Sequence, residues 1–229
     1  MAKPLIIAVE GVDKTGKATQ VAKMVEYLRQ RGVACETIAY PNYNSMFGKQ
    51  IKKVLTGEYG DLKNIPPEFI AMLYAIDRRN DSRDFVRGWL SEGKWVVFDR
   101  YTYSNLFNVA RYPEEVWDEK IKFIEDIEFV DAKMPRPDLC LYLYVDPNIA
   151  YDNRHQNLKS YQDKPDLNES NLKLLTDVSR VYHKVAARDP DRWMIIDQME
   201  PGYRMSIEEV WEKIRERLDE LIDNANNAV

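Results

Sequence analysis

Five short apolar runs alternate with longer amphipathic stretches along this chain. The runs are Leu5–Val9, Val33–Tyr40, Trp95–Phe98, Leu139–Val145 and Trp193–Ile196. Short runs rich in β-branched and aromatic residues are typical of buried strands, and the stretches between them carry apolar residues at helical spacing. Strands that alternate with helices predict an α/β domain of three layers, with a five-stranded parallel sheet and helices on both faces.

Residues that are typical of helix starts and helix ends predict where the helices begin and end. Gly32 is a good helix terminator, Ser45 is a candidate N-cap, and Pro66 and Pro67 suit a helical first turn. We predict helices from the end of the first loop to Arg31 and over Ser45–Leu55, Pro66–Leu90 (with a break inside it left open), Tyr103–Ala110, Glu114–Asp131, Asn148–Leu158, Glu169–Arg188 and Ser206–Asp223. We expect Thr56–Asn64 to be a loop and Asn224–Val229 to fray.

A glycine-bounded loop follows the first strand and precedes the first helix. It spans Gly11–Lys17 and matches G-x-x-x-x-G-K. Glycines let such a loop turn tightly and aim backbone N–H groups at an anion, and the lysine reaches the β- and γ-phosphates of a nucleotide. The hydroxyl residue that normally ends the motif and ligates Mg²⁺ is replaced by Ala18, while Thr19 points about 100° away on a helix. A glycine-rich turn without a nucleotide is the alternative.

A second polar pair follows the third strand. Asp99 and Arg100 come directly after Phe98, at the end of parallel strands where ligands bind. The carboxylate can hold Mg²⁺, and the guanidinium can clamp phosphate oxygens. An ordinary ion pair at a strand end is the alternative.

Composition narrows the function classes. The 229 residues fit one domain over 1–229 and carry a net charge of −5, which argues against nucleic acid or a membrane surface as partner. The two cysteines lie in apolar runs without metal-ligand spacing, which predicts buried free thiols. Neither a signal peptide nor a membrane span is expected, so we predict a cytoplasmic protein.

Several motifs together resemble those of the thymidylate kinases. The loop Glu10–Lys17 is similar to that family's E-G-x-D-x-x-G-K. The other matching segments, in the family's order and spacing over about residues 5–197, are Tyr40-Pro41, Ala75–Arg79, Asp99–Tyr101, Ser104-Asn105 and Pro137-Asp138.

The resemblance implies a P-loop kinase fold and transfer of the γ-phosphoryl group of ATP to dTMP. It also implies Mg²⁺ as cofactor, ATP as co-substrate and a homodimer. It assigns ATP binding to Gly11, Val12, Asp13, Lys14, Thr15, Gly16, Lys17, Ala18 and Thr19, and metal binding to Asp13 and Asp99. It assigns catalysis to Asp13, Lys17, Arg100 and Arg154, and substrate binding to Tyr43, Phe69, Tyr74, Arg78, Arg100, Asn105 and Asn108.

Within that set, the resemblance gives Arg78 and Arg100 the acceptor phosphate and Tyr74 the base by stacking. Asn105 can both donate and accept, as a thymine edge requires. Core packing of Tyr74 and a polar helix-end role for Asn105 are the alternatives.

Residues 154–168 resemble the family's lid, where Arg154, Lys159 and Lys164 could close over the phosphates; a solvated charged loop is the alternative. The apolar residues of Glu114–Asp131 offer a dimer face or, equally, a core face; they are Val116, Ile121, Ile124 and Ile127.

The chain departs from the family pattern at three places. Ala18 predicts a changed Mg²⁺ shell. Asn42 and Asn44 stand near the place of an arginine for the acceptor phosphate, and Asn108 stands where some members carry a tyrosine beside the sugar. Acceptance of dUMP, a ribonucleotide or a modified pyrimidine is therefore a hypothesis. A kinase for another nucleoside monophosphate and a non-catalytic nucleotide-binding module are the rival interpretations.

Overall fold

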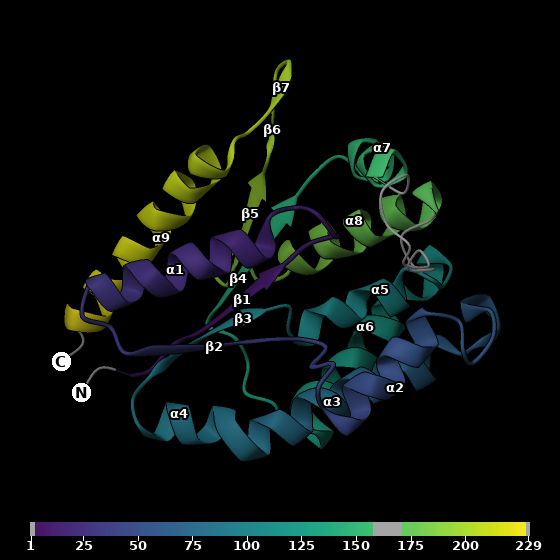
Figure 1. Ribbon diagram of the computed structural model, residues 1–229, viewed down its shortest axis with the longest axis horizontal. Helices are drawn as coiled ribbons and strands as arrows, with labels where there is room; N and C mark the ends of the chain where they lie inside the picture. The colour runs from purple at the N-terminus through teal and green to yellow at the C-terminus, as the bar shows by residue number, and fades with distance from the viewer. Residues whose placement is uncertain (1–2, 158–170, 228–229) are drawn as a thin grey trace.

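A single parallel sheet organises the molecule. The computed structural model describes residues 3–157 and 171–227, and in that part the strand order is β2-β3-β1-β4-β5 (Figure 1). The strands are β1 (Ile6–Glu10), β2 (Cys35–Ala39), β3 (Trp95–Asp99), β4 (Leu139–Tyr144) and β5 (Trp193–Asp197). All five predicted strands are confirmed, with ends that differ by one or two residues, and every neighbouring pair is parallel.

Helices connect the strands as the apolar periodicity predicted. They are α1 (Lys17–Gln30), α2 (Met46–Leu55), α3 (Pro67–Asp81), α4 (Arg87–Ser91), α5 (Leu106–Val109), α6 (Trp117–Glu125), α7 (Pro147–Asn157), α8 (Leu172–Ala186) and α9 (Ile207–Asn227). The Ser45 N-cap is confirmed, because the Ser45 hydroxyl accepts a 2.7 Å hydrogen bond from the backbone N–H of Gly48.

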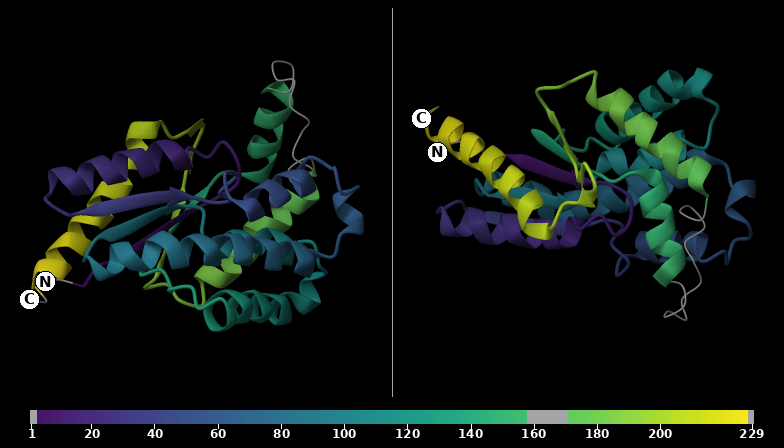
Figure 2. Two further views of the ribbon diagram at one scale, coloured as in Figure 1. Left: turned by 60° about the horizontal axis from the view of Figure 1, so that its bottom comes forward. Right: turned by 90° about the horizontal axis from the view of Figure 1, so that it is seen from above.

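The two faces of the sheet bury different sets of helices, which gives three layers. Ile7 and Val9 of β1 pack with apolar residues of α1 and α9, including Met24 and Ile214. The alternate β1 residues point to the opposite face, where α5, α6 and α8 pack. Figures 1 and 2 show α1 and α9 on one side of the sheet and the other set across it. The predicted three-layer architecture is confirmed.

The structure differs from the prediction in several connections. The long helix from Pro67 is continuous with a π-helical segment over Ser82–Val86 and then α4, and a second π-helical segment, Asp126–Asp131, follows α6. The expected loop before α3 contains a 3-10 turn, Leu62–Asn64. The expected fraying from Asn224 is wrong as far as Asn227, where α9 ends.

A hairpin after β5 was missed altogether. It consists of β6 (Met199–Glu200) and β7 (Tyr203–Arg204), joined by a turn at Gly202, whose φ is 92°. Figure 1 shows it projecting beyond the carboxyl ends of the parallel strands. In the described residues, no helix is both long and apolar enough to cross a membrane.

Candidate active site

The phosphate loop, residues 11–17, links β1 to α1 in a conformation that requires its glycines. Gly11 has a φ of 148°, and a Cβ there would lie 2.8 Å from the carbonyl oxygen of Leu143 in β4. Gly16 has a φ of 88° at the position before α1. An L side chain at either position would be strained, and at Gly11 it would also collide with the backbone. The sheet and the helix thereby fix the course of the loop.

Lys17, the first residue of α1, turns back over this loop. Its ammonium group donates a 2.7 Å hydrogen bond to the carbonyl oxygen of Val12, and the side-chain hydroxyl of Thr15 donates one of 3.0 Å to the same oxygen. Lys17 is only 8% exposed. A cation held over a loop at a helix N-terminus is suited to binding phosphate oxygens.

The segment around the missed hairpin braces the phosphate loop from outside. The side-chain amide of Gln198 donates a 2.9 Å hydrogen bond to the carbonyl oxygen of Thr15, and Arg204 donates one of 3.1 Å to that of Lys14. Arg204 also donates to the Gln198 carboxamide oxygen at 3.0 Å. No motif in the sequence marks these two residues.

A cavity of about 480 Å³ opens beside the phosphate loop, and we call it the phosphate cavity. Six of the nine residues predicted to bind ATP line it, namely Asp13, Lys14, Gly16, Lys17, Ala18 and Thr19. Asp99 and Arg100 are on its wall as well. The β1–β3 pairing, with Val9 opposite Asp99, brings the loop after one strand against the end of the other. The structure therefore gathers both predicted polar motifs at one cavity.

Two carboxylates of that cavity could hold a magnesium ion. Burial raises the pKa of Asp99 above its usual value, with the Asp13 charge adding to the rise, while Lys17 and Arg100 oppose it. Within the described residues no group of three or more metal-ligating side chains occurs. Mg²⁺ at kinase sites uses one or two carboxylates together with substrate phosphates, so Asp13 and Asp99 fit that requirement without a third ligand.

Arg100 stands between the phosphate cavity and a second one. Its backbone has a φ of 66°, and its guanidinium donates a 2.9 Å hydrogen bond to the carbonyl oxygen of Gly11 and forms an ion pair with Asp13. The second cavity, which we call the acceptor cleft, shares five wall residues with the first: Asp13, Tyr40, Pro41, Tyr43 and Arg100. The two cavities are thus contiguous at the Arg100–Asp13 pair.

The acceptor cleft contains most of the residues predicted to bind the acceptor. Tyr43, Tyr74, Arg78 and Asn108 line it together with Arg100. The guanidinium carbon of Arg78 lies 5.9 Å from the ring centre of Tyr74, on the next turn of α3.

Two other predicted residues lie away from the cleft wall. Phe69 is 55% exposed at the start of α3, and Asn105 is 1% exposed. Neither is on the wall of the cleft. Their roles as substrate contacts stay predictions.

A buried polar network lies behind the cleft. Arg78 forms an ion pair with Glu128, and both side chains are at most 1% exposed. The amide nitrogen of Asn105 donates to Glu128 Oε1 at 2.7 Å, and its oxygen accepts a 3.1 Å hydrogen bond from Asn108. Sequence reasoning missed Glu128, because it lies on an amphipathic stretch without a motif.

Glu10, the last residue of β1, is a second buried acid. It accepts hydrogen bonds from the backbone N–H of Tyr101 (2.9 Å), the hydroxyl of Ser104 (2.6 Å) and the hydroxyl of Tyr182 (3.1 Å). Burial raises the pKa of Glu10, and these donors oppose the rise. Glu10 thereby links β1, the strand before the phosphate loop, to the turn after β3 and, through Tyr182, to α8.

The turn after β2 is held by two acids of α3. Asp77 accepts from the backbone N–H of Asn42 at 2.9 Å and from the Ser45 hydroxyl, and Asp81 accepts from the Asn42 side-chain amide at 2.9 Å. The backbone and the side chain of Asn42 both hold the turn in place, and the turn puts Tyr43 on the walls of both cavities.

The predicted lid falls mostly outside the described residues. Arg154 lies within α7 and its side chain is not among those described; Lys159 and Lys164 lie outside the described residues altogether. The helix that follows is anchored: Asn171 caps α8 by accepting from the backbone N–H of Lys173 at 2.9 Å.

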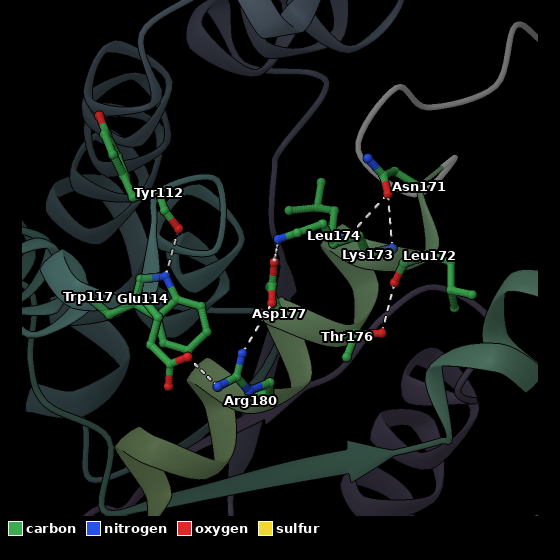
Figure 3. A network of polar contacts seen from close by, with 10 residues as sticks. All are labelled: Tyr112, Glu114, Trp117, Asn171, Leu172, Lys173, Leu174, Thr176, Asp177 and Arg180. Carbon is green, nitrogen blue, oxygen red and sulfur yellow. Dashed lines mark hydrogen bonds and ion pairs between the residues drawn. The ribbon is translucent and has the colours of Figure 1, made fainter.

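A charge network joins α8 to Glu114, which lies just before α6 (Figure 3). Asp177 pairs with Lys173 at 2.6 Å and with Arg180 at 3.5 Å, and Arg180 also pairs with Glu114. The Lys173, Arg180 and Glu114 side chains are exposed and only that of Asp177 is mostly buried, so the pairs contribute modestly to stability. On α6 itself, Ile121 and Ile124 are buried in the core, so the core alternative for that helix face is confirmed at these two positions.

Comparison with known proteins gives a consistent result. The family model for thymidylate kinase matches residues 9–214. A thymidylate kinase of Mycobacterium tuberculosis is 30% identical over 203 residues, which cover 86% of this chain and 94% of that relative. One from Danio rerio is 25% identical over 225 residues, covering 96% and 92%.

A solved structure shows the same fold. The thymidylate kinase of Candida albicans matches with a TM-score of 0.71 at 20% identity, over 98% of this chain and 95% of that one. The expected P-loop kinase fold is therefore confirmed.

Proposed function

This chain belongs to the thymidylate kinase family, and on that premise we propose that it transfers the γ-phosphoryl group of ATP to dTMP. The observation that carries the proposal is the continuity of the two cavities. The phosphate cavity and the acceptor cleft share the Arg100–Asp13 pair, which lies between the phosphate loop and the acceptor residues. A donor and an acceptor phosphate bound in these cavities would meet at that pair.

On the ATP side, the loop N–H groups and the Lys17 ammonium bind the phosphates. Lys17 exchanges its hydrogen bond to the Val12 carbonyl for phosphate oxygens when nucleotide arrives. Asp13 and Asp99 would hold Mg²⁺, which would supply positive charge to stabilise the transferring phosphoryl group. Catalysis of this transfer depends on positioning and on charge stabilisation, and these groups are already fixed by the sheet.

On the acceptor side, Arg100 supplies the positive charge. Its side chain is 18% exposed, so the guanidinium can reach a phosphate while it stays tied to Gly11. Arg78 is already neutralised by Glu128, so it contributes directed hydrogen bonds more than net charge. Tyr74, on the cleft wall, supplies a ring face for the base. The Arg154 side chain is proposed to complete the site over the phosphates.

The test is an acceptor panel. ADP formation is measured with MgATP and dTMP, dUMP, UMP, dCMP, dGMP or AMP. We expect strong turnover with dTMP and little with the purine nucleotides. Preference for a purine acceptor would favour the rival monophosphate kinase, and nucleotide binding without turnover on any acceptor would favour the non-catalytic module.

A broader pyrimidine range is supported by Asn108. This residue lines the acceptor cleft at 6% exposure, and its side chain is smaller than the tyrosine that some family members carry at this position. We expect Asn108→Tyr to discriminate more strongly than the wild type against dUMP and UMP. Equal discrimination in the two proteins would remove the basis for the broader range.

We also propose a homodimer through α3. Phe69, Met72 and Ile76 follow a spacing of i, i+3 and i+7 and are 55%, 43% and 44% exposed, which is an apolar stripe on one helix face. Light scattering should report a dimer for the wild type and a monomer for Met72→Glu. The matched control is Ile207→Glu on α9, where a 51% exposed isoleucine lies on a helix that packs on the other face of the sheet and should leave the dimer intact.

A cytoplasmic location is proposed from the thiols. Cys35 and Cys140, on β2 and β4, are both buried and free, and burial raises the pKa of each thiol. Unpaired thiols are typical of proteins in a reducing compartment. Fractionation of cells that express the tagged chain tests this proposal, and recovery in the cytosolic fraction is expected.

A further inference from the structure

We propose that Glu128 is a positioning residue that sets the hydrogen-bond polarity of the acceptor cleft, that is, which side-chain atoms facing the cleft donate hydrogen bonds and which accept them. It does not line the cleft, and it follows α6 in the second π-helical segment. Its carboxylate is 0% exposed and contacts Arg78 and Asn105, and through Asn105 it acts on Asn108. The inference rests on the proposed function, because the polarity matters only for a base that is bound in this cleft.

The first effect of Glu128 is on Arg78. The Arg78 Nε donates to Glu128 Oε2 at 3.1 Å, and Nη2 pairs with Glu128 Oε1, so the carboxylate contacts one edge of the guanidinium at two points. Two-point contact of this kind fixes the plane of an arginine. The pair is neutral as a whole, and Nη1 has no hydrogen-bond partner within the described residues. Arg78 therefore offers the cleft a hydrogen-bond donor with a fixed direction.

The second effect is on the orientation of Asn105. Its amide nitrogen faces two groups that only accept, Glu128 Oε1 at 2.7 Å and the backbone carbonyl of Ala71 at 3.1 Å. The amide oxygen must then point the other way, where it accepts the 3.1 Å hydrogen bond from the Asn108 amide nitrogen. The Asn108 oxygen, without a partner within the described residues, is the atom left to accept from a ligand.

The cleft therefore presents a donor from Arg78 and an acceptor from Asn108. A pyrimidine-2,4-dione such as thymine carries the complementary pair, the O4 acceptor and the N3–H donor. Cytosine carries the reverse, an N4 donor and an N3 acceptor. A binding site built to hydrogen-bond one pattern rejects the other strongly, because its buried polar groups are left unpaired. Glu128 thus contributes to selectivity for a dione base.

The test replaces the carboxylate by its neutral isostere. In Glu128→Gln, the new amide N–H₂ group faces the donors of Arg78 and Asn105, and the positive charge of Arg78 is no longer balanced. The Asn105 amide can then turn round, so that its oxygen faces the glutamine. We expect the ratio of kcat/KM for dTMP to that for dCMP to fall by about tenfold or more, as the loss of a specifying polar contact predicts. The KM for ATP should stay unchanged. Glu125→Gln is the matched control, since Glu125 accepts from the Tyr103 hydroxyl at 3.2 Å, away from the cleft wall, and should preserve the ratio.

A second variant tests the same proposal if Glu128→Gln does not fold. Asn108→Ala leaves the buried ion pair intact and should lower the same ratio. An unchanged ratio in Asn108→Ala, or in a folded Glu128→Gln, would overturn the proposal and leave Glu128 as a structural ion-pair partner only. A wild type that phosphorylates neither pyrimidine would instead overturn the proposed function, so the two failures are distinguishable.

Discussion

The side-chain amide of Gln198 donates a 2.9 Å hydrogen bond to the backbone carbonyl oxygen of Thr15. This contact joins the residue after β5, at one edge of the sheet, to the phosphate loop that follows the central strand. Gln198 is 2% exposed, and its own oxygen accepts from Arg204 at 3.0 Å. The loop that binds phosphate is thus braced by a segment 183 residues away in sequence.

Gln198→Leu should loosen the phosphate loop. The substitution leaves the Thr15 carbonyl without its partner, and an unsatisfied buried group of this kind costs about 1–3 kcal/mol in the free energy of unfolding. We expect a several-fold rise in the KM for ATP with little change in the KM for dTMP, measured by steady-state kinetics. Gln30→Leu, at the exposed end of α1, is the control. Equal changes in the two KM values would show that Gln198 does not act through the ATP side.

Lys17→Met should reduce turnover more than binding of the acceptor. The ammonium lies over the phosphate loop and can follow charge that develops on the transferred group. Removal of one such contact typically lowers kcat by roughly 10² or more. Lys23→Met, six residues along the same helix and paired with Glu208, should keep wild-type turnover. A kcat of Lys17→Met within a few-fold of the wild type would contradict the role assigned to this lysine.

Ala18→Ser restores a hydroxyl at the position where phosphate loops usually ligate Mg²⁺. Ala18 and Thr19 both line the phosphate cavity. We expect Ala18→Ser to reach half-maximal activity at a lower Mg²⁺ concentration than the wild type, because a further oxygen ligand is available. Thr19→Ala should leave the Mg²⁺ dependence unchanged. A shift in Thr19→Ala alone would mean that Thr19 supplies the ligand in this chain.

Asp99→Asn should stabilise the protein at neutral pH while it lowers activity. Burial raises the pKa of Asp99 in the folded state, so the folded protein binds the proton more tightly than the unfolded chain. The stabilisation that this proton provides is complete below the unfolded pKa of about 3.9 and is lost as the pH rises through the folded pKa. The variant's melting temperature should exceed that of the wild type at pH 7, and the gap should close below about pH 4. A lower melting temperature at pH 7 would contradict this account.

Local patterns were sufficient for most of the architecture. The apolar runs predicted every strand of the large sheet because strand burial depends on short continuous hydrophobic segments, and Ser45 was predicted as an N-cap because its side chain acts within its own turn. The β6–β7 hairpin was missed because strands of two residues have no periodicity, although Pro201-Gly202 is a turn signal. The π-helical segments were missed because their apolar pattern is the same as that of an α-helix.

Site residues divide along a similar line. Lys17 and Asp99 were predicted because each sits at a fixed offset from a strand, and the sheet brings such offsets to one edge. Asp13 was predicted from the family resemblance. The roles of Glu10, Glu128 and Gln198 could not be predicted in this way. A buried acid or amide is recognised only by the donors and acceptors around it, and these come from segments distant in the chain.

The amino-acid sequence by itself determined the alternation of strands and helices, the phosphate loop and the family, because these depend on residues close together in the chain. Only the tertiary structure decided how the polar groups are paired. It matched Arg78 with Glu128, turned Asn105 away from the cleft wall, and left Arg100 between the two cavities. The physical reason is that hydrogen bonds and ion pairs act over a few ångströms, so the role of a side chain depends on which distant segments the packed sheet brings within that range.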